Sequence, residues 1–298
     1  MISEKIKHLA ETTHMTNAEI ARELNCSERS VRRYAGEWKA RMMHTRSAHA
    51  LQGGERKAIL LYDPHIPYQD DRAYEIAMDY VREWQPDDII LGGDFADFKH
   101  VSFWKDAPGR SNLADEINVV RNYLFDLRET FPSQRIVYLE GNHEARLARY
   151  LYTKAPELYG LPELTVPTLL RLGELDIQYV SNISLLNHGQ KPFCLGKLSV
   201  LHGHEVKVSW DGVNIARTMY LKTHANIIFG HNHQSQQFIF KKLNGKHESS
   251  TMVGALCQLS EPYQSVNNWV HGFCTVRYNP VTGAFKIRNK LILDGQVL

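Results

Sequence analysis

The chain has 298 residues, 43% of them hydrophobic and 23% charged, and a formal net charge of +2 at pH 7. This is the composition of a soluble globular protein, and no stretch approaches the roughly 18–20 apolar residues of a membrane span. Acidic residues and histidines close to the N-terminus argue against a signal peptide, and the four cysteines form no C-x-x-C pair or disulfide framework. A cytoplasmic location, in a bacterial or phage-infected cell, is therefore predicted.

Residues 1–45 predict a small domain of three short helices. Thr16 and Glu19 fit a capping box that opens a helix over 17–24. A three-residue turn separates this helix from a longer one over 28–41, whose apolar residues recur at helical spacing and leave a basic outer face. A helix, a tight turn and a second helix together favour a helix-turn-helix.

Positive charge is concentrated in this part of the chain. The first fifty residues hold nine Lys and Arg against six Asp and Glu, a net charge of +3. Residues 18–34 resemble the helix-turn-helix of resolvase-like and regulator-like DNA-binding domains, which makes DNA the predicted partner. The alternative is a three-helix cap or a dimerisation element with a solvated basic face. The side chains predicted to contact DNA are Arg29, Ser30, Arg32 and Arg33.

A larger domain over 57–298 follows a linker over 46–56, which loses helical periodicity and contains two glycines. Its first predicted strand, 57–62, leads to Asp63 and His65. A carboxylate and an imidazole two residues apart, just past a strand, can bind one metal ion, although this pair alone is a common pattern.

The next predicted strand, 87–91, delivers two glycines, then Asp94, and three residues later Asp97. Ligands bind at the carboxyl ends of strands in open α/β sheets, so a site is expected at this edge. Residues 98–111 interleave basic and aromatic side chains, which suits contact with a nucleic-acid strand. A loop packed by its own aromatic residues is an equal alternative.

A third strand over 135–139 leads into Gly141-Asn142-His143-Glu144. Helices predicted over 71–83 and 113–130 separate the three strands, which gives a βαβαβ layer. Residues 145–154 continue as a helix. The Pro- and Leu-rich stretch that follows it is expected to be irregular, and no function is assigned to it.

The second half of the domain is predicted to be mainly β. Short strands include 176–180, 183–187 and 193–201, the last of which leads into His202-Gly203-His204. After a helix, a strand over 226–229 leads into Gly230-His231-Asn232-His233. The rest of the chain alternates apolar and polar residues, which predicts three or four antiparallel strands that complete a second sheet.

Five motifs in this order resemble the signature of the calcineurin-like metallophosphoesterases, closest to their phosphodiesterase or nuclease branch. They are D-x-H from Asp63, G-D-x-x-D from Gly93, G-N-H-E from Gly141, H-G-H from His202 and G-H-x-H from Gly230. The resemblance covers about residues 57–240 and implies a four-layer α/β/β/α sandwich with two metals between the sheets, preceded here by the small helix-turn-helix domain.

The resemblance also implies a ligand set and a reaction. Two metals about 3.5–4 Å apart clamp a phosphate and activate a hydroxide that attacks phosphorus in line. Carboxylates, an amide oxygen and imidazoles suit Mn²⁺, Fe or Zn better than Ca²⁺ and select no single metal. The predicted cofactor is a pair of divalent ions, Mn²⁺ with Fe, Zn or Mg as alternatives. Asp63, His65 and His233 would hold the first metal, Asn142, His202 and His231 the second, and Asp94 would bridge both.

Two further residues receive roles from the same resemblance. His143 would protonate the leaving oxygen or stabilise the transition state, and Asp97 would orient it. Protein phosphatases of the family continue their second motif with Arg-Gly, whereas Phe98-Lys99 follows Asp97 here. That departure favours a phosphodiesterase over a Ser/Thr phosphatase.

The sequence thus predicts a metal-dependent phosphodiesterase, namely a DNA-processing nuclease tethered by its N-terminal domain. A phosphatase or phosphodiesterase that acts on small phosphoesters or nucleotides is one alternative. A DNA-binding regulator with a phosphoesterase domain as sensor is another. A homodimer or a higher homo-oligomer is compatible with the single short DNA-binding unit.

Overall fold

The computed structural model describes residues 16–24, 31, 54–103, 112–181, 191–208, 213–260 and 267–298. The chain divides into two compact units. One unit contains residues 1–53 and 121–134, and the other contains residues 54–120 and 135–298. The boundaries predicted from sequence, with a linker over 46–56, stay a prediction.

In the first unit, α2 (Asn17–Glu23) begins at the predicted capping box. The Thr16 hydroxyl accepts from the Glu19 backbone N–H at 3.2 Å, and the Glu19 carboxylate accepts from the Thr16 N–H at 2.5 Å. This confirms the predicted start of the helix. The predicted helix over 28–41, with Arg29, Ser30, Arg32 and Arg33, lies outside the described residues apart from Val31. The helix-turn-helix therefore stays a prediction.

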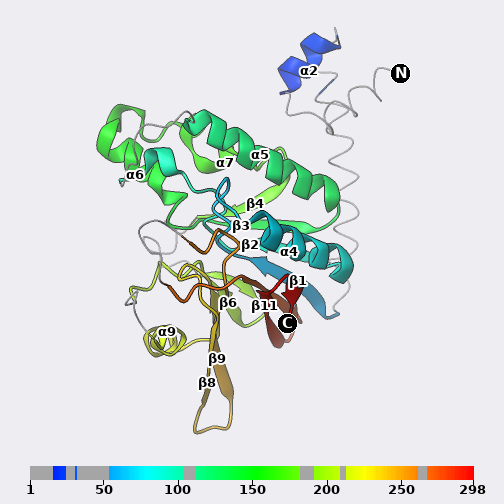
Figure 1. The fold of residues 1–298 in the computed structure, drawn as a ribbon, viewed down its shortest axis with the longest axis vertical. Helices are drawn as coiled ribbons and strands as arrows, with labels where there is room; N and C mark the ends of the chain where they lie inside the picture. Colours follow the sequence, from blue (N-terminus) through cyan, green and yellow to red (C-terminus); the bar gives the residue numbers. More distant parts are fainter. Residues whose placement is uncertain are drawn as a thin grey trace. The chain divides into compact units, whose positions relative to one another are not determined.

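The second unit is a mixed α/β structure with two sheets, as predicted (Figure 1). The larger sheet has the order β12-β11-β10-β1-β2-β3-β4, and β1 to β4 run parallel. The predicted βαβαβ order is thereby confirmed. The bounds of its strands are β1 (Arg56–Leu61), β2 (Asp88–Leu91), β3 (Arg135–Leu139), β4 (Ile177–Val180), β10 (Gly272–Tyr278), β11 (Phe285–Leu293) and β12 (Gln296–Val297).

The smaller sheet has the order β5-β6-β7-β9-β8. The predicted single strand over 193–201 is wrong, because Gly196, at φ 64°, turns the chain into a hairpin of two short strands. The prediction that all strands after 236 complete this sheet is also wrong, since β10, β11 and β12 extend the larger one. The strands here are β5 (Phe193–Leu195), β6 (Leu198–Val200), β7 (Ile227–Phe229), β8 (Gln236–Lys241) and β9 (His247–Met252).

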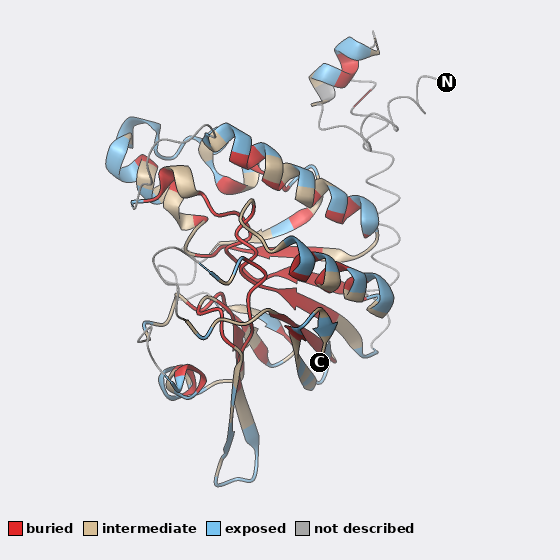
Figure 2. Cartoon of the chain, viewed as in Figure 1, coloured by how far each residue is buried: buried red, intermediate tan, exposed pale blue. Residues whose placement is uncertain are grey.

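The two sheets pack face to face through one apolar core. Leu60 and Val137 of the larger sheet share a buried cluster with Val200 and Ile228 of the smaller one. Figure 2 shows these central strands coloured as buried. At about 25 cal/mol per Å² of buried apolar surface, this interface is a main source of stability for the unit.

Helices lie on the outer faces of both sheets (Figure 1). On the larger sheet, α4 (Asp71–Trp84) buries side chains at helical spacing, and its Tyr80 ring lies 4.9 Å from the Phe273 ring of β10. On the smaller sheet, Met219 of α9 (Ile215–Thr223) packs in a cluster with Phe229 of β7. Each sheet therefore has one face on the shared core and helices on the other.

Two longer helices and four short turns complete the helical elements. Three of the turns lie in the stretch over 155–174 that was predicted to be irregular, and no function follows from them. Their bounds are α5 (Leu113–Thr130), α6 (Ala145–Lys154), η1 (Lys99–Val101), η2 (Pro156–Leu158), η3 (Pro162–Leu164) and α7 (Val166–Leu169). Among the described residues, none of the helices combines the length and the apolar character that crossing a bilayer requires.

At the amino ends of the parallel strands, the Asp88 carboxylate of β2 binds polar side chains of the neighbouring strands. Its carboxylate accepts from Arg56 at 2.9 Å, Arg135 at 2.7 Å and the Tyr278 hydroxyl at 2.7 Å. These contacts join β1, β2, β3 and β10. The loops of the first three sequence motifs follow the opposite, carboxyl ends of β1, β2 and β3, and those of the last two follow β6 and β7 of the smaller sheet.

Candidate metal centre

The loops that follow β1, β2 and β3 bring the first predicted ligands together. Because the three strands are parallel, their carboxyl ends meet at one edge. Asp63, His65 and Asp94 offer donor atoms within 4.8 Å of one another, and all three are buried. His65 Nε2 also lies 3.3 Å from His233 Nε2, on the loop after β7. Four of the seven predicted ligands therefore form one group.

The second group shares Asp94 with the first. Asp94, His202 and His231 again offer donor atoms within 4.8 Å of one another. His202 Nε2 lies 3.2 Å from Asp94 Oδ2 and 3.1 Å from Asn142 Oδ1. The His231 N–H donates to Asp63 Oδ2 at 2.8 Å, which links the two groups. All seven predicted ligands thus meet, with Asp94 between the groups.

Five of these seven residues have left-handed backbone conformations. Their φ angles are 51° for Asp63, 52° for His65, 49° for Asp94, 68° for His231 and 57° for His233. Residues other than glycine rarely adopt this region, which costs of order 1–3 kcal/mol each and persists only where the surroundings fix it. Strained backbone conformations of this kind are concentrated at functional sites. The loops therefore adopt conformations that place these side chains together, although the backbone alone would favour others.

Two glycines let the loops approach the carboxylates closely. A Cβ on Gly141 would lie 2.1 Å from Asp94 Oδ1, and one on Gly230 would lie 2.5 Å from Asp63 Oδ2. Both distances are far inside ordinary contact, so no larger residue fits without moving a carboxylate. The glycines of the third and fifth motifs therefore have a steric reason.

The buried carboxylates and imidazoles perturb one another's titration. Burial raises the pKa of Asp63 to about 6. Burial lowers the pKa of His65, but the hydrogen bond with Asp97 and the charge of Asp94 outweigh it, and the pKa rises to about 9. Burial also lowers the pKa of His202, but the charge of Asp94 outweighs it, and the pKa rises to about 10.

The other two imidazoles are shifted the opposite way. Burial, and after it the charge of His202, lowers the pKa of His231 to about 3. Burial and the charge of His65 hold the pKa of His233 well below its ordinary value. Both rings are therefore neutral at pH 7, which is the form that coordinates a metal.

The donor set fits divalent cations. Asp63 Oδ1 is buried and accepts no hydrogen bond from the residues that the structure describes. His202 Nδ1 lies 3.1 Å from the Gly92 carbonyl, an acceptor, so Nδ1 carries a proton. Its Nε2 then faces two oxygen acceptors, Asp94 Oδ2 and Asn142 Oδ1. A proton or a metal ion must lie there to join them, and oxygen with imidazole nitrogen is the donor chemistry of Mn, Fe and Zn.

Asp97 holds two imidazoles at once. Its Oδ2 lies 3.1 Å from His65 Nδ1 and 3.1 Å from His143 Nδ1, while Arg146 donates to its Oδ1 at 3.1 Å. Burial would raise the pKa of Asp97, but these hydrogen bonds with His143 and His65 hold it far below its ordinary value. A carboxylate behind a ligand histidine fixes the tautomer that presents Nε2 to a metal. The contact with His65 was not foreseen from the sequence.

The protonation of His143 follows from Arg146. The Arg146 guanidinium lies 2.8 Å from His143 Nε2 and has no acceptor atom, so Nε2 must accept and Nδ1 must carry the proton. His143 Nε2 also lies 3.7 Å from Asp94 Oδ2. Its backbone N–H donates to Asp94 Oδ1 at 2.8 Å. His143 therefore borders the candidate centre through both its ring and its backbone.

Glu144 is a buried carboxylate for which no role was predicted from the sequence. It accepts from the backbone N–H groups of Asp94, Ala96 and Gly141 at 2.8–3.0 Å, and from the Tyr138 hydroxyl at 2.6 Å. It therefore joins the turns after β2 and β3. Its position inside the third motif was a signal, but only the fold shows which donors it serves.

Other polar residues near the centre received no role from the sequence. The His204 ring lies 5.2 Å from the His202 ring, and Arg146 reaches the centre from α6. The thiol of Cys257 lies beside His233. Of the basic and aromatic loop predicted over 98–111, residues after Phe103 lie outside the described part, and Phe103 itself is 83% exposed.

Comparisons with known proteins give remote likenesses. No family model matches the chain. The Gene 54 protein of Mycobacterium phage L5 is 24% identical over 186 residues, which is 60% of this chain and 69% of that protein. The Gene 54 protein of Mycobacterium phage D29 is 25% identical over 107 residues, 35% of this chain and 42% of that protein.

Among solved structures, Vacuolar Protein Sorting 29 from Cryptosporidium parvum covers 82% of this chain and 95% of its own, with 14% identity and a TM-score of 0.43. At these levels of identity and overlap, none of the likenesses assigns the chain to a family. The side chains of the candidate centre carry the functional conclusion instead.

Proposed function

We propose that the chain is a dinuclear metal-dependent phosphoesterase of the calcineurin-like kind that hydrolyses phosphodiester bonds. One observation carries the proposal. Seven side chains from five loops, each following a different strand, meet in one cluster with Asp94 shared by its two halves. Five of them are buried, and Asn142 and His231 are half-buried. The same seven positions are the ligands that the motif order implies.

In this proposal the cluster holds two ions. Asp63, His65 and His233 would hold the first, Asn142, His202 and His231 the second, and Asp94 both. When bound, two divalent ions polarise a phosphate and supply a hydroxide nucleophile at neutral pH. We propose Mn²⁺ as the working cofactor, with Fe, Zn or Mg as substitutes, because the oxygen and nitrogen donors accept all of them.

The residues beside the ions would handle the proton and the position of the substrate. Asp97 fixes the His143 ring through Nδ1, so Nε2 is the nitrogen that can exchange a proton with a leaving oxygen. Arg146 contacts that same nitrogen and brings a permanent positive charge to the edge of the centre. Together with the bound ions, this charge would help to neutralise the negative charge of an approaching phosphate group.

DNA is the substrate class we propose. The N-terminal part carries the net charge of +3 and the predicted helix-turn-helix, and a polyanion is the partner that such a charge favours. The absence of Arg-Gly after Asp97 favours a diester over a monoester. A small-molecule phosphoesterase, or a DNA-binding regulator with a sensor domain, remains the alternative proposal.

The test is a panel of substrates with Mn²⁺. DNA, RNA, bis-p-nitrophenyl phosphate and p-nitrophenyl phosphate are offered to the wild-type chain, to Asp94→Asn and to Asp79→Asn. The control Asp79 lies on the exposed side of α4, its side chain 73% exposed. We expect DNA and the diester to be cleaved by the wild type and by Asp79→Asn, and not by Asp94→Asn.

The other outcomes separate the alternatives. Cleavage of the monoester and nucleotides alone would reject the nuclease and favour a small-molecule enzyme. If the Asp94→Asn variant still rescues function in cells, the regulator is favoured.

The N-terminal contact with DNA has its own test. The double variant Arg32→Ala, Arg33→Ala should reduce the slope of log binding constant against log salt concentration by about 0.9 per lost phosphate contact. Hydrolysis of the small diester should not change.

A further inference from the structure

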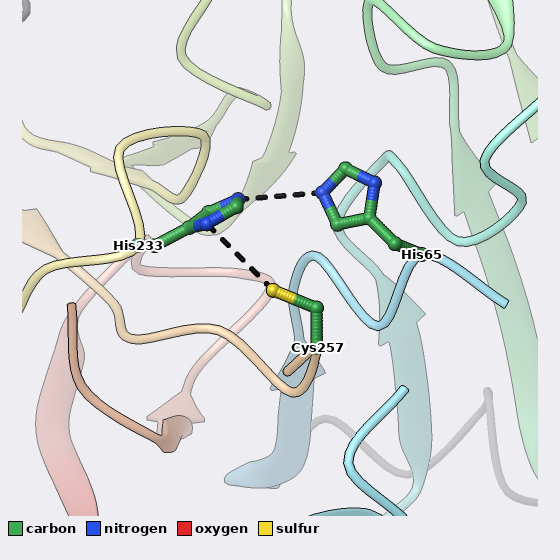
Figure 3. A group of neighbouring side chains, drawn as sticks. All are labelled: His65, His233 and Cys257. Atoms are coloured by element: carbon green, nitrogen blue, oxygen red, sulfur yellow. Dashed lines mark hydrogen bonds between the residues drawn. The ribbon is translucent and has the colours of Figure 1, made fainter. Parts of the chain in front are cut away.

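Cys257, between β9 and β10, places a sulfur atom at the edge of the first group of ligands. The residue is 4% exposed, and its Sγ lies 3.7 Å from His233 Nδ1. Figure 3 shows the His65 and His233 rings turned toward each other, with the sulfur directed at His233. A donor atom of each of these three residues lies within 4.8 Å of the other two.

Backbone hydrogen bonds fix the place of this thiol. The Leu256 N–H donates to the Asp63 carbonyl at 3.3 Å, and the Gln258 N–H donates to the Tyr68 carbonyl at 3.1 Å. The Cys257 carbonyl lies 2.9 Å from His271 Nε2. The segment that carries the sulfur is therefore joined to the loop that carries Asp63 and His65.

The spacing and chemistry of the three residues suit one ion. An imidazole nitrogen at about 2.1 Å and a thiolate sulfur at about 2.3 Å from one ion lie at most about 4.4 Å apart. The donor atoms of the three residues lie within 4.8 Å of one another, so a small approach would let them share an ion. Sulfur with two imidazoles is a common donor set for borderline metals. We infer that Cys257 is a sulfur ligand of the ion that His65 and His233 hold.

This inference rests on the proposed metal centre and adds to its selectivity. An all-oxygen and nitrogen site accepts Mn²⁺ and Mg²⁺ readily, whereas a sulfur donor favours Zn²⁺, Co²⁺ or Fe. The first ion would therefore be the more thiophilic of the two. The two other cysteines in the described part do not share this position: Cys194 is exposed, and Cys274 is buried at the β10–β11 pairing.

The experiment is the absorption spectrum of the Co²⁺-loaded full chain. We expect near-ultraviolet sulfur-to-cobalt charge-transfer absorption in the wild type, its retention in Cys194→Ser and its loss in Cys257→Ser. Competition titrations should show that Cys257→Ser lowers the affinity for Zn²⁺ by about 10–100-fold, with a smaller change for Mn²⁺. Circular dichroism checks that the serine variants remain folded.

Three results would overturn the inference. Visible cobalt d–d bands without charge-transfer absorption would show that a metal binds without sulfur, so the metal centre would stand and Cys257 would not be a ligand. Equal losses of Zn²⁺ and Mn²⁺ affinity in Cys257→Ser would show that the sulfur only supports His233 through Nδ1. A wild type that takes up no Co²⁺, Zn²⁺ or Mn²⁺ would reject the proposed function itself.

Discussion

Gly141→Ala tests whether the third motif is held in place by close backbone packing. A Cβ at this position would lie 2.1 Å from Asp94 Oδ1 and 2.3 Å from Asp94 N. Ordinary contact begins near 3.4 Å, so the overlap with the carboxylate oxygen is 3.4 − 2.1 = 1.3 Å. The side chain could rotate away, but the backbone nitrogen could not.

Relief of this overlap requires the turns after β2 and β3 to separate. Overpacking of this kind costs typically 1–3 kcal/mol, and the backbone contact puts Gly141→Ala at about 3 kcal/mol. The same movement would carry Asp94 away from His202, whose Nε2 now lies 3.2 Å from it. We therefore expect lower stability and weaker metal uptake in the same variant.

Gly173→Ala is the matched control, because a Cβ there would have no atom of the described residues within 4 Å. Urea unfolding of the metal-free chains would give the free energies of unfolding, and metal analysis after dialysis would give the content per chain. If Gly141→Ala matched Gly173→Ala within about 0.5 kcal/mol, the size expected of a neutral surface change, and kept its metals, the steric reasoning would be wrong.

Three further predictions concern protons and supporting residues. With pKa values of about 9 and 10, His65 and His202 are protonated at pH 7 without metal, so metal affinity should rise with pH up to that range. Loading at pH 7 should release about two protons per chain, measured by calorimetry in buffers of different ionisation enthalpy; no release would contradict the assignment. His143→Ala should keep its metals, since the backbone N–H to Asp94 remains, and lose about 10²–10⁴ in kcat. Asp97→Asn should weaken metal binding about 10–100-fold through His65, and exposed Asp79→Asn should not.

The parts of the fold that sequence predicts well are those set by local signals. The apolar run of β2 ends in two glycines, and the strand ends where they occur. Thr16 and Glu19 form the expected capping box because both partners lie within one turn. The motif residues were found because each follows a strand directly, and parallel strands bring their ends together.

The missed features depend on contacts between distant segments. Alternation of apolar and polar residues indicates a strand but does not tell which sheet the strand joins, so β10 was placed in the wrong one. Cys257 has no motif around it and reaches the centre because its segment pairs with Gln69. Asp97 likewise contacts both His65 and His143 only because the fold brings three separate loops together.

One of the two strands that pair with β1, β10, is synthesised long after β1 itself. Arg56 pairs with Tyr278, which lies 222 positions further along the chain. At about 5–20 residues per second, a ribosome needs roughly 10–45 s to make that distance. During this interval one edge of β1 has no native neighbour, and such an edge can recruit strands from other nascent chains. Chaperones that bind the nascent chain during translation should therefore raise the yield of folded protein more than chaperones that are added after the chain has left the ribosome.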